Sequence, residues 1–165
     1  MNNKGDQVSL RLWDELTKGP YRDQAEKIML HGTGDIGPEF LGFMETYYHL
    51  SLIISPKRTI IDLGCAYGFQ AYYFKDHLGY VGVDNGDGPQ LVTPNAKYYK
   101  MNIEDFIKMD LTEHSNPFAI CNYVPMRSNK EVRERFSDLF VFYVSHDDVK
   151  HMHLMICEDR RKVGS

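Results

Sequence analysis

Two glycines and two carboxylates lie in this chain at a spacing that could hold a nucleotide-like ligand. In the segment 59–68, an apolar run ends at Asp62, and Gly64 and Gly68 follow. Glycine has no Cβ, so a ligand can approach the main chain closely at these positions. A second apolar run ends at Asp84, twenty residues after Gly64. An acid at about that offset can accept hydrogen bonds from both hydroxyls of a ribose.

A strand, a turn, a helix and a second strand are needed to position these residues. The sequence predicts a strand up to Asp62, a helix over 69–74 and a strand over 79–84. The turn would present bare backbone N–H groups at the positive end of the helix. This stretch is therefore the predicted site of a nucleotide-like cofactor.

The ordered elements over residues 58–84 resemble the first half of a class I S-adenosylmethionine-dependent methyltransferase. That family begins its cofactor site with an acid-Leu-Gly-Cys-Gly-x-Gly turn, and the matching residues here are Asp62, Leu63, Gly64, Cys65 and Gly68. Ala66 replaces the usual middle glycine, and the bulkier Tyr67 replaces a common Ser or Thr. The resemblance extends more weakly to about residue 125.

The resemblance implies that the cofactor is S-adenosyl-L-methionine and that it lies across four strand ends. The residues expected to bind it are Asp62, Gly64, Cys65, Ala66, Tyr67, Gly68, Asp84, Asn85, Asn102, Ile103 and Asn122. The turn would wrap the methionine end, with Asp62 ordering the turn and balancing the ammonium group. Asp84 would hold the ribose, and Asn102 with Ile103 would hold the adenine.

Two of these assignments have plain structural alternatives. Asn102 could instead cap the helix that begins at Ile103, with Asp105 at the capping-box position. The segment 122–125 (Asn-Tyr-Val-Pro) partly matches the (Asp/Asn)-Pro-Pro-aromatic turn of methyltransferases that act on amino groups, but it is also an ordinary strand end before a proline. In either case Asn122 would border the methyl donor.

No catalytic residue is assigned from the sequence. Methyl transfer from an activated donor depends mainly on positioning, and a base is needed only if the acceptor arrives protonated. The candidate bases are His31, Asp35 and His146. The polar run 146–153 contains histidines and acids, but its spacing is that of a polar turn, so no metal site is predicted.

Three alternatives to the methyltransferase remain open. A dinucleotide site requires G-x-G-x-x-G, whereas the glycines here are spaced G-x-x-x-G, which makes a nicotinamide-dependent oxidoreductase less favoured. A non-catalytic protein could bind S-adenosylmethionine or serve as a regulator on the same fold. A plain strand-turn-helix without a ligand is the structural alternative, which the presence of Asp84 disfavours.

The predicted fold class is α/β. It is a doubly wound, mostly parallel Rossmann-like sheet with an N-terminal helical cap and an abbreviated C-terminal part. Residues 1–165 form a single domain, with the cap over 1–56 and the core over 57–165. Cap helices are expected over 8–16, 21–30 and 39–54, with a glycine-rich loop at 31–38. Further strands are expected over 96–101, 118–124, 139–145 and 153–157, and helices over 103–109 and 129–138.

Composition limits the partners and the location. The 165 residues carry a net charge of −4, which argues mildly against nucleic acid, so the acceptor is expected to be a small molecule or a protein. The sequence has no apolar run of ~20 residues and no signal-peptide core at its start, so a cytoplasmic location without membrane contact is expected. Three dispersed cysteines fit a reducing compartment. The short C-terminal part would leave a sheet edge that a homodimer could cover.

Overall fold

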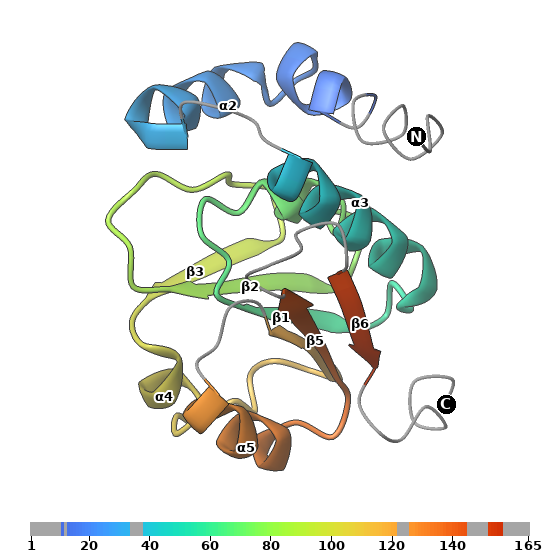
Figure 1. The fold of residues 1–165 in the computed structure, drawn as a ribbon, viewed down its shortest axis with the longest axis vertical. Helices are drawn as coiled ribbons and strands as arrows, with labels where there is room; N and C mark the ends of the chain where they lie inside the picture. The colour runs from blue at the N-terminus through green and yellow to red at the C-terminus, as the bar shows by residue number, and fades with distance from the viewer. Residues whose placement is uncertain (1–10, 12, 34–37, 122–125, 145–151, 157–165) are drawn as a thin grey trace.

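The computed structural model describes residues 11, 13–33, 38–121, 126–144 and 152–156 (Figure 1). Residues 13–18 are helical, and the elements that follow are α2 (Arg22–Ile28), a π-helical turn (Met29–Thr33), α3 (Pro38–Ile53), β1 (Thr59–Leu63), a 3-10 turn (Phe69–Tyr72), β2 (Gly79–Asp84), β3 (Ala96–Lys100), α4 (Ile103–Phe106), β4 (Pro117–Cys121), α5 (Met126–Arg135), β5 (Leu139–Val144) and β6 (Met152–Ile156).

The strands form one sheet in the order β3-β2-β1-β4-β5-β6. The first five strands are parallel, and β6 runs antiparallel to β5. The chain order reverses between β1 and β4, which is the point where doubly wound sheets bind ligands beyond their strand ends. The predicted doubly wound, mostly parallel Rossmann-like sheet is therefore confirmed.

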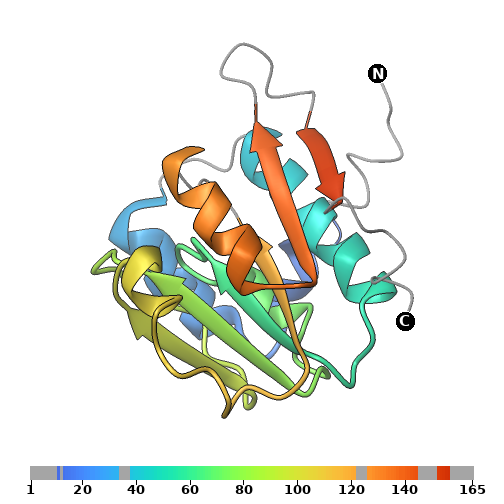
Figure 2. The same ribbon diagram turned by 90° about the horizontal axis from the view of Figure 1, so that it is seen from below.

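Side chains on the central strands alternate between two packed layers. In β1, Ile60 faces the cluster that contains Tyr47 of α3, whereas Ile61 faces the cluster that contains Phe106 of α4 and Val132 of α5. Figure 1 shows α2 and α3 above the sheet and α4 and α5 below it, and Figure 2 shows α4 and α5 from that lower side. Every residue of β1 is buried, as expected for a strand covered on both faces.

The N-terminal helices pack on the turn that follows β1. Leu16, Ala25 and Ile28 share a buried cluster with Phe69 and Leu91. The ring of Trp13 meets the ring of Phe69 edge-on, with 5.3 Å between their centroids. This contact places the helices against the same end of the sheet as the glycine turn.

The helix predicted over 69–74 is present only as a short 3-10 helix, and an α-helix does not form there. The segment forms only a 3-10 turn, and the backbone N–H of Tyr73 bonds to the carbonyl of Gln70 instead of continuing an α-helix. The cause is packing, because Phe69 is buried against the N-terminal helices while Phe74 is buried beneath Tyr47 and beside Tyr80. The expected helix dipole at the glycine turn is therefore missing.

Other element ends differ by a few residues. The predicted glycine-rich loop begins later than expected, because helical geometry continues through the π-helical turn to Thr33. The predicted helix over 103–109 is reduced to α4. Residues 34–37 and 122–125 lie outside the described residues. In the described part of the chain, no helix is long and apolar enough to cross a membrane.

Arg58 ties together the amino ends of three neighbouring strands. Its Nη2 donates to Asp138 Oδ2 at 2.6 Å and to the carbonyl of Pro117 at 2.7 Å, and its Nε donates to the carbonyl of Asn116. The side chains of Arg58 and Asp138 are only 10% and 16% exposed. Removal of one charge would leave the other buried and unpaired, which is more costly than loss of a surface pair.

We expect Arg58→Ala to lower the free energy of unfolding by about 3 kcal/mol, because Asp138 would lose its cation. Chemical denaturation measures this change. Arg22→Ala is the control, since the Arg22–Glu26 pair is exposed and should contribute less than about 1 kcal/mol. Adding Asp138→Ala to Arg58→Ala should recover part of the loss. Equal effects of Arg58→Ala and Arg22→Ala would contradict this account.

Candidate functional site

A cavity of about 280 Å³ lies at the carboxyl ends of β1 and β2. It is lined by His31, Ala66, Tyr67, Asp84, Gly86, Asp87 and Gly88. Parallel pairing of β1 with β2 places Leu63 beside Val83, so the segments that follow the two strands emerge side by side. His31 comes from the π-helical turn after α2, which adds a wall from the N-terminal helices.

The glycine turn folds back over the end of β2. The backbone N–H groups of Gly64 and Cys65 both donate to the carbonyl of Val83, at 2.8 and 3.1 Å. Gly64, Ala66 and Gly68 all have positive φ, at 84°, 50° and 71°. Glycine adopts this conformation without cost, whereas Ala66 holds it with steric strain.

Asp84, at the end of β2, is hydrogen-bonded to the glycine turn. Its Oδ2 accepts a hydrogen bond from the backbone N–H of Ala66 at 3.0 Å, and its Oδ1 accepts one from Gly86 at 2.8 Å. An ionised carboxylate has about four acceptor positions, so capacity remains on the side that lines the cavity. The sequence placed Asp84 at this strand end, and the structure brings it directly to the glycine turn.

Tyr98 of β3 occupies the space that was expected to admit a ligand at Gly68. A Cβ on Gly68 would lie 2.9 Å from ring carbons of Tyr98, and a Cβ on Gly82 would lie 2.6 Å from the same ring. The hydroxyl of Tyr98 donates to the carbonyl of Leu91. The expectation of close ligand approach at Gly68 therefore needs correction, because the missing Cβ makes room for a protein side chain.

Asp62 is fully buried beneath the turn and does not line the cavity. Tyr47 donates to its Oδ1 at 2.9 Å, and Gln70 and Tyr80 donate to its Oδ2 at 2.7 and 2.5 Å. Gln70 also donates to the carbonyl of Cys65 at 2.8 Å. The expected contact with a cofactor ammonium group is thus replaced by a structural role, whereas the expected ordering of the turn agrees with these bonds.

Burial raises the pKa of Asp62 to about 6, although the hydrogen bonds from Tyr80, Gln70 and Tyr47 act in the opposite direction. Burial also raises the pKa of the Cys65 thiol, and the charges of Asp62 and Asp84 add to that effect. Cys65 therefore contributes its backbone to the turn and a neutral side chain to the core.

Tyr67 forms a wall of the cavity. Its ring meets the ring of His31 edge-on, with 6.1 Å between centroids, and a Cβ on Gly88 would lie 2.6 Å from a carbon of the same ring. The backbone carbonyl of Tyr67 accepts a bond from Leu91 N–H at 2.9 Å. Glycine at position 88 therefore leaves room for the bulky ring of Tyr67.

Two residues of the expected cofactor-binding set meet beyond the ends of β2 and β3. Asn85 Nδ2 donates to Asn102 Oδ1 at 3.0 Å, and both side chains are exposed. Asn102 stands at the N-cap position of α4, but its side chain makes no capping bond. The capping alternative is therefore not observed, while Ile103 packs partly against the core.

Several sequence candidates cannot be placed. Asn122, Asp35 and the polar run 146–153 lie wholly or almost wholly outside the described residues, so their roles stay predictions. Among the residues that the structure describes, no three His, Cys, Asp or Glu side chains group in a way that could hold a metal ion.

The sequence reasoning missed residues on the loop between β2 and β3. Gly86, Asp87 and Gly88 line the cavity, although none of them was among the residues expected to bind the cofactor. The sequence feature that could have indicated them is their position directly after β2, the strand that pairs with β1. Tyr47, Tyr80 and Gln70 carried no such signal, since each reaches Asp62 only through the packing of a separate element.

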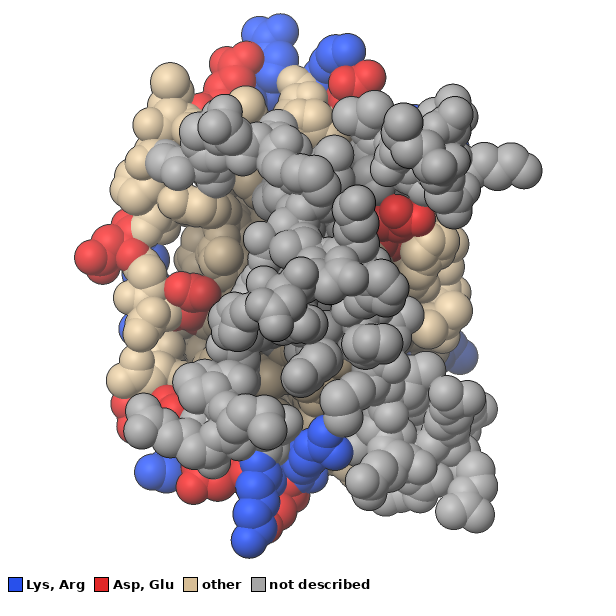
Figure 3. All heavy atoms as spheres, viewed as in Figure 1, with Lys and Arg blue, Asp and Glu red and all other residues tan. Residues whose placement is uncertain are grey.

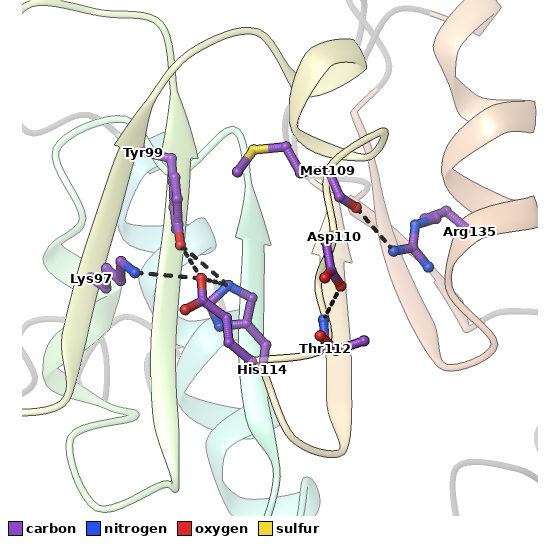
Figure 4. Close-up of polar contacts among 8 residues, drawn as sticks. Lys97, Tyr99, Met109, Asp110, Thr112, His114 and Arg135 are labelled. Carbon is purple, nitrogen blue, oxygen red and sulfur yellow. Dashed lines mark hydrogen bonds and ion pairs between the residues drawn. The ribbon is translucent and has the colours of Figure 1, made fainter.

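A second polar cluster lies on the α4 side of the sheet (Figure 4). Glu113 accepts a hydrogen bond from Tyr99 at 2.8 Å and lies 3.5 Å from Lys97 Nζ and from His114 Nε2. The bond from Tyr99 and then the charge of Lys97 lower the pKa of Glu113. More than half of Lys97 and of Glu113 is exposed, and the bond from Tyr99 to Glu113 ties a turn to β3.

The described charges on the face shown in Figure 3 are mixed, with Lys and Arg beside Asp and Glu. On α5, Lys130 faces Glu134 at 3.9 Å, and both are exposed. Exposed charges of both signs at this spacing are typical of a solvated helix face.

Comparison with known proteins adds one structural similarity. No family model matches the chain, and no curated protein matches it in sequence. The chain is similar to a solved structure from Anaeromyxobacter dehalogenans described as a candidate type II methyltransferase, with 15% identity and a TM-score of 0.45. The match covers 61% of this chain and 48% of that one, so it spans about half of that protein. The strand order and directions by themselves define an α/β protein with a Rossmann-like sheet.

We expect Ala66→Gly to raise the free energy of unfolding by up to about 1 kcal/mol, because glycine removes the strain of a positive φ. Thermal or chemical denaturation measures the change. Ala96→Gly in β3 is the matched control and should destabilise by about 1 kcal/mol, since an extended strand gains nothing from glycine. A similar loss in both variants would show that the turn is not strained.

Asp62 should make the free energy of unfolding depend on pH. The relevant window lies between the pKa of Asp62 in the unfolded chain, near 4, and its pKa in the folded protein, about 6. In this window the unfolded chain releases the proton while the folded protein retains it, so stability from this group falls as pH rises. The unfolding free energy of the protein minus that of Asp62→Asn should fall by on the order of 3 kcal/mol from pH 4 to 7. A pH-independent difference would contradict the raised pKa.

Proposed function

We propose that this chain binds S-adenosyl-L-methionine in the cavity beside Asp84 and is a methyltransferase whose acceptor is a small molecule or a protein. The observation that carries the proposal is the position of Asp84. Its carboxylate lies at the end of β2, is bonded to the glycine turn at Ala66, and lines a cavity at the carboxyl edge of the sheet. Ligands of doubly wound sheets bind at this edge.

The cavity is organised before any ligand arrives. The bonds from Ala66 and Gly86 hold the carboxylate of Asp84 in one orientation, and its remaining acceptor capacity suits the two hydroxyls of a ribose. Asn85 follows Asp84 at the end of β2, and Asn102 lies beyond the end of β3, where its amide oxygen can accept a bond from an adenine amino group. Fixed acceptors of this kind lower the entropic cost of binding.

The charge of the cavity favours a cationic ligand over a dinucleotide. Asp84 and Asp87 line it, and within the described part of the chain the lining contains no Lys or Arg. A pyrophosphate would meet these carboxylates without a compensating helix N-terminus, because the segment after the turn is only a four-residue 3-10 turn. A sulfonium and an ammonium group would instead be attracted.

A bound donor of this type supplies a methyl group on a positively charged sulfur, which is already activated for displacement. The chain's part is then to hold the donor in line with the acceptor and to exclude water. His31 lines the cavity, which supports it as the base for an acceptor that arrives protonated.

We expect Asp84→Ala and Asp84→Asn to weaken binding of S-adenosylhomocysteine by about tenfold or more, because the ribose loses a charged acceptor. Asp84→Asn retains an oxygen for the Ala66 N–H, so it separates loss of charge from loosening of the turn. Isothermal titration calorimetry measures the affinity, with Asp76→Ala as an exposed control.

The proposal fails if the unmodified protein gives no binding heat, or if both Asp84 variants bind as the protein does. Tighter binding of a nicotinamide dinucleotide would favour the oxidoreductase instead. Binding of S-adenosylmethionine without methyl transfer to any tested small-molecule or protein acceptor would favour the non-catalytic alternative.

A further inference from the structure

We propose that Gln24 is a positioning residue for the cavity, because it fixes the loop between β2 and β3 from which one cavity wall is built. Gln24 lies in α2, outside the Rossmann-like core, and does not line the cavity itself. The inference rests on the proposed function for the identity of the ligand, but the positioning can be measured without one.

The side-chain amide of Gln24 binds both backbone groups of Val92. Gln24 Nε2 donates to the carbonyl of Val92 at 3.0 Å, and the N–H of Val92 donates to Gln24 Oε1 at 2.7 Å. The two residues are 68 positions apart in the sequence. A glutamine amide has one acceptor and two donors, so it can satisfy a peptide N–H and C=O together.

Hydrogen bonds connect this contact to the cavity. Leu91 N–H donates to the carbonyl of Tyr67, and the hydroxyl of Tyr98 donates to the carbonyl of Leu91. Gln90 Nε2 donates to the carbonyl of Ala66 at 3.1 Å. Residues 90–92 are therefore held against the glycine turn on one side and α2 on the other.

The wall residues lie between two fixed points. Gly86, Asp87 and Gly88 follow the end of β2 and precede the segment 90–92. Glycine restricts the backbone of a loop less than other residues do. The conformation of residues 86–88 therefore depends on its two anchors, which are the end of β2 and the segment 90–92. Displacing the segment 90–92, the second anchor, would move Asp87 and would change the contact of Gly88 with Tyr67.

Burial by itself does not fix the second anchor. Leu91 is fully buried beside Ile28 of α2, which keeps the loop close to the helix. Val92, however, is 55% exposed, so packing of its side chain does not set the orientation of its peptide. Directional hydrogen bonds supply that orientation: the Tyr98 hydroxyl holds the Leu91 carbonyl, and Gln24 holds both the N–H and the carbonyl of Val92.

The test uses Gln24→Ala, which removes both bonds, and Gln24→Glu, which retains an acceptor but loses the donor. Lys27→Ala on the same helix is the control, since Lys27 is exposed. Calorimetry should show about tenfold weaker binding of S-adenosylhomocysteine for Gln24→Ala, weakened binding for Gln24→Glu and no change for Lys27→Ala.

The second measurement needs no ligand. In the free protein, amide exchange at Val92 should accelerate in both Gln24 variants, and the amide resonances of Gly86 and Gly88 should shift, while those of β4 stay unchanged. If Gly86 and Gly88 keep their resonances, or if a protein that binds the ligand keeps full affinity in Gln24→Ala, the inference is overturned. If the unmodified protein does not bind, the proposed function fails, and the resonances alone decide whether Gln24 positions the wall.

Discussion

The buried carboxylate of Asp62 is the interaction on which the candidate site depends. Three elements that are separate in sequence converge on it through Tyr47 of α3, Gln70 of the 3-10 turn and Tyr80 of β2. A buried charge is costly unless its acceptors are satisfied, so these donors must stay in place. Because Gln70 also holds the carbonyl of Cys65, the same bonds fix the glycine turn above the strand end.

Side chains, and not the expected helix N-terminus, determine the surroundings of the glycine turn. Asp84 receives the N–H of Ala66, and Tyr98 fills the space left by the missing Cβ atoms of Gly68 and Gly82. A helix N-terminus would favour an anion at this position, whereas the carboxylates of Asp84 and Asp87 favour a cation. The electrostatics of the site thus differ from those of a phosphate-binding turn, as does the G-x-x-x-G spacing of its glycines.

Much of the fold could be predicted, because the signals that define it are local. Apolar runs bounded by glycine and acid indicated the strands, and β1, β2 and β3 begin or end within a residue or two of the expected positions. The segment 69–74 forms no α-helix, because its aromatic residues are buried in two different clusters and this packing outweighs the local preference for a helix. Asp84 was found from its offset to Gly64, whereas Tyr98 and Gln24 act through contacts that no spacing reveals.

The sequence by itself determined the Rossmann-like sheet and the position of Asp84 at the end of β2, since these follow from periodicity and residue type. Only the tertiary structure decided that Asp62 is buried, that Gly68 faces Tyr98 and that α2 holds the loop after β2. Those facts depend on which distant side chains share one space. Packing and directional hydrogen bonds between separate elements set them, and a linear pattern does not encode such pairings.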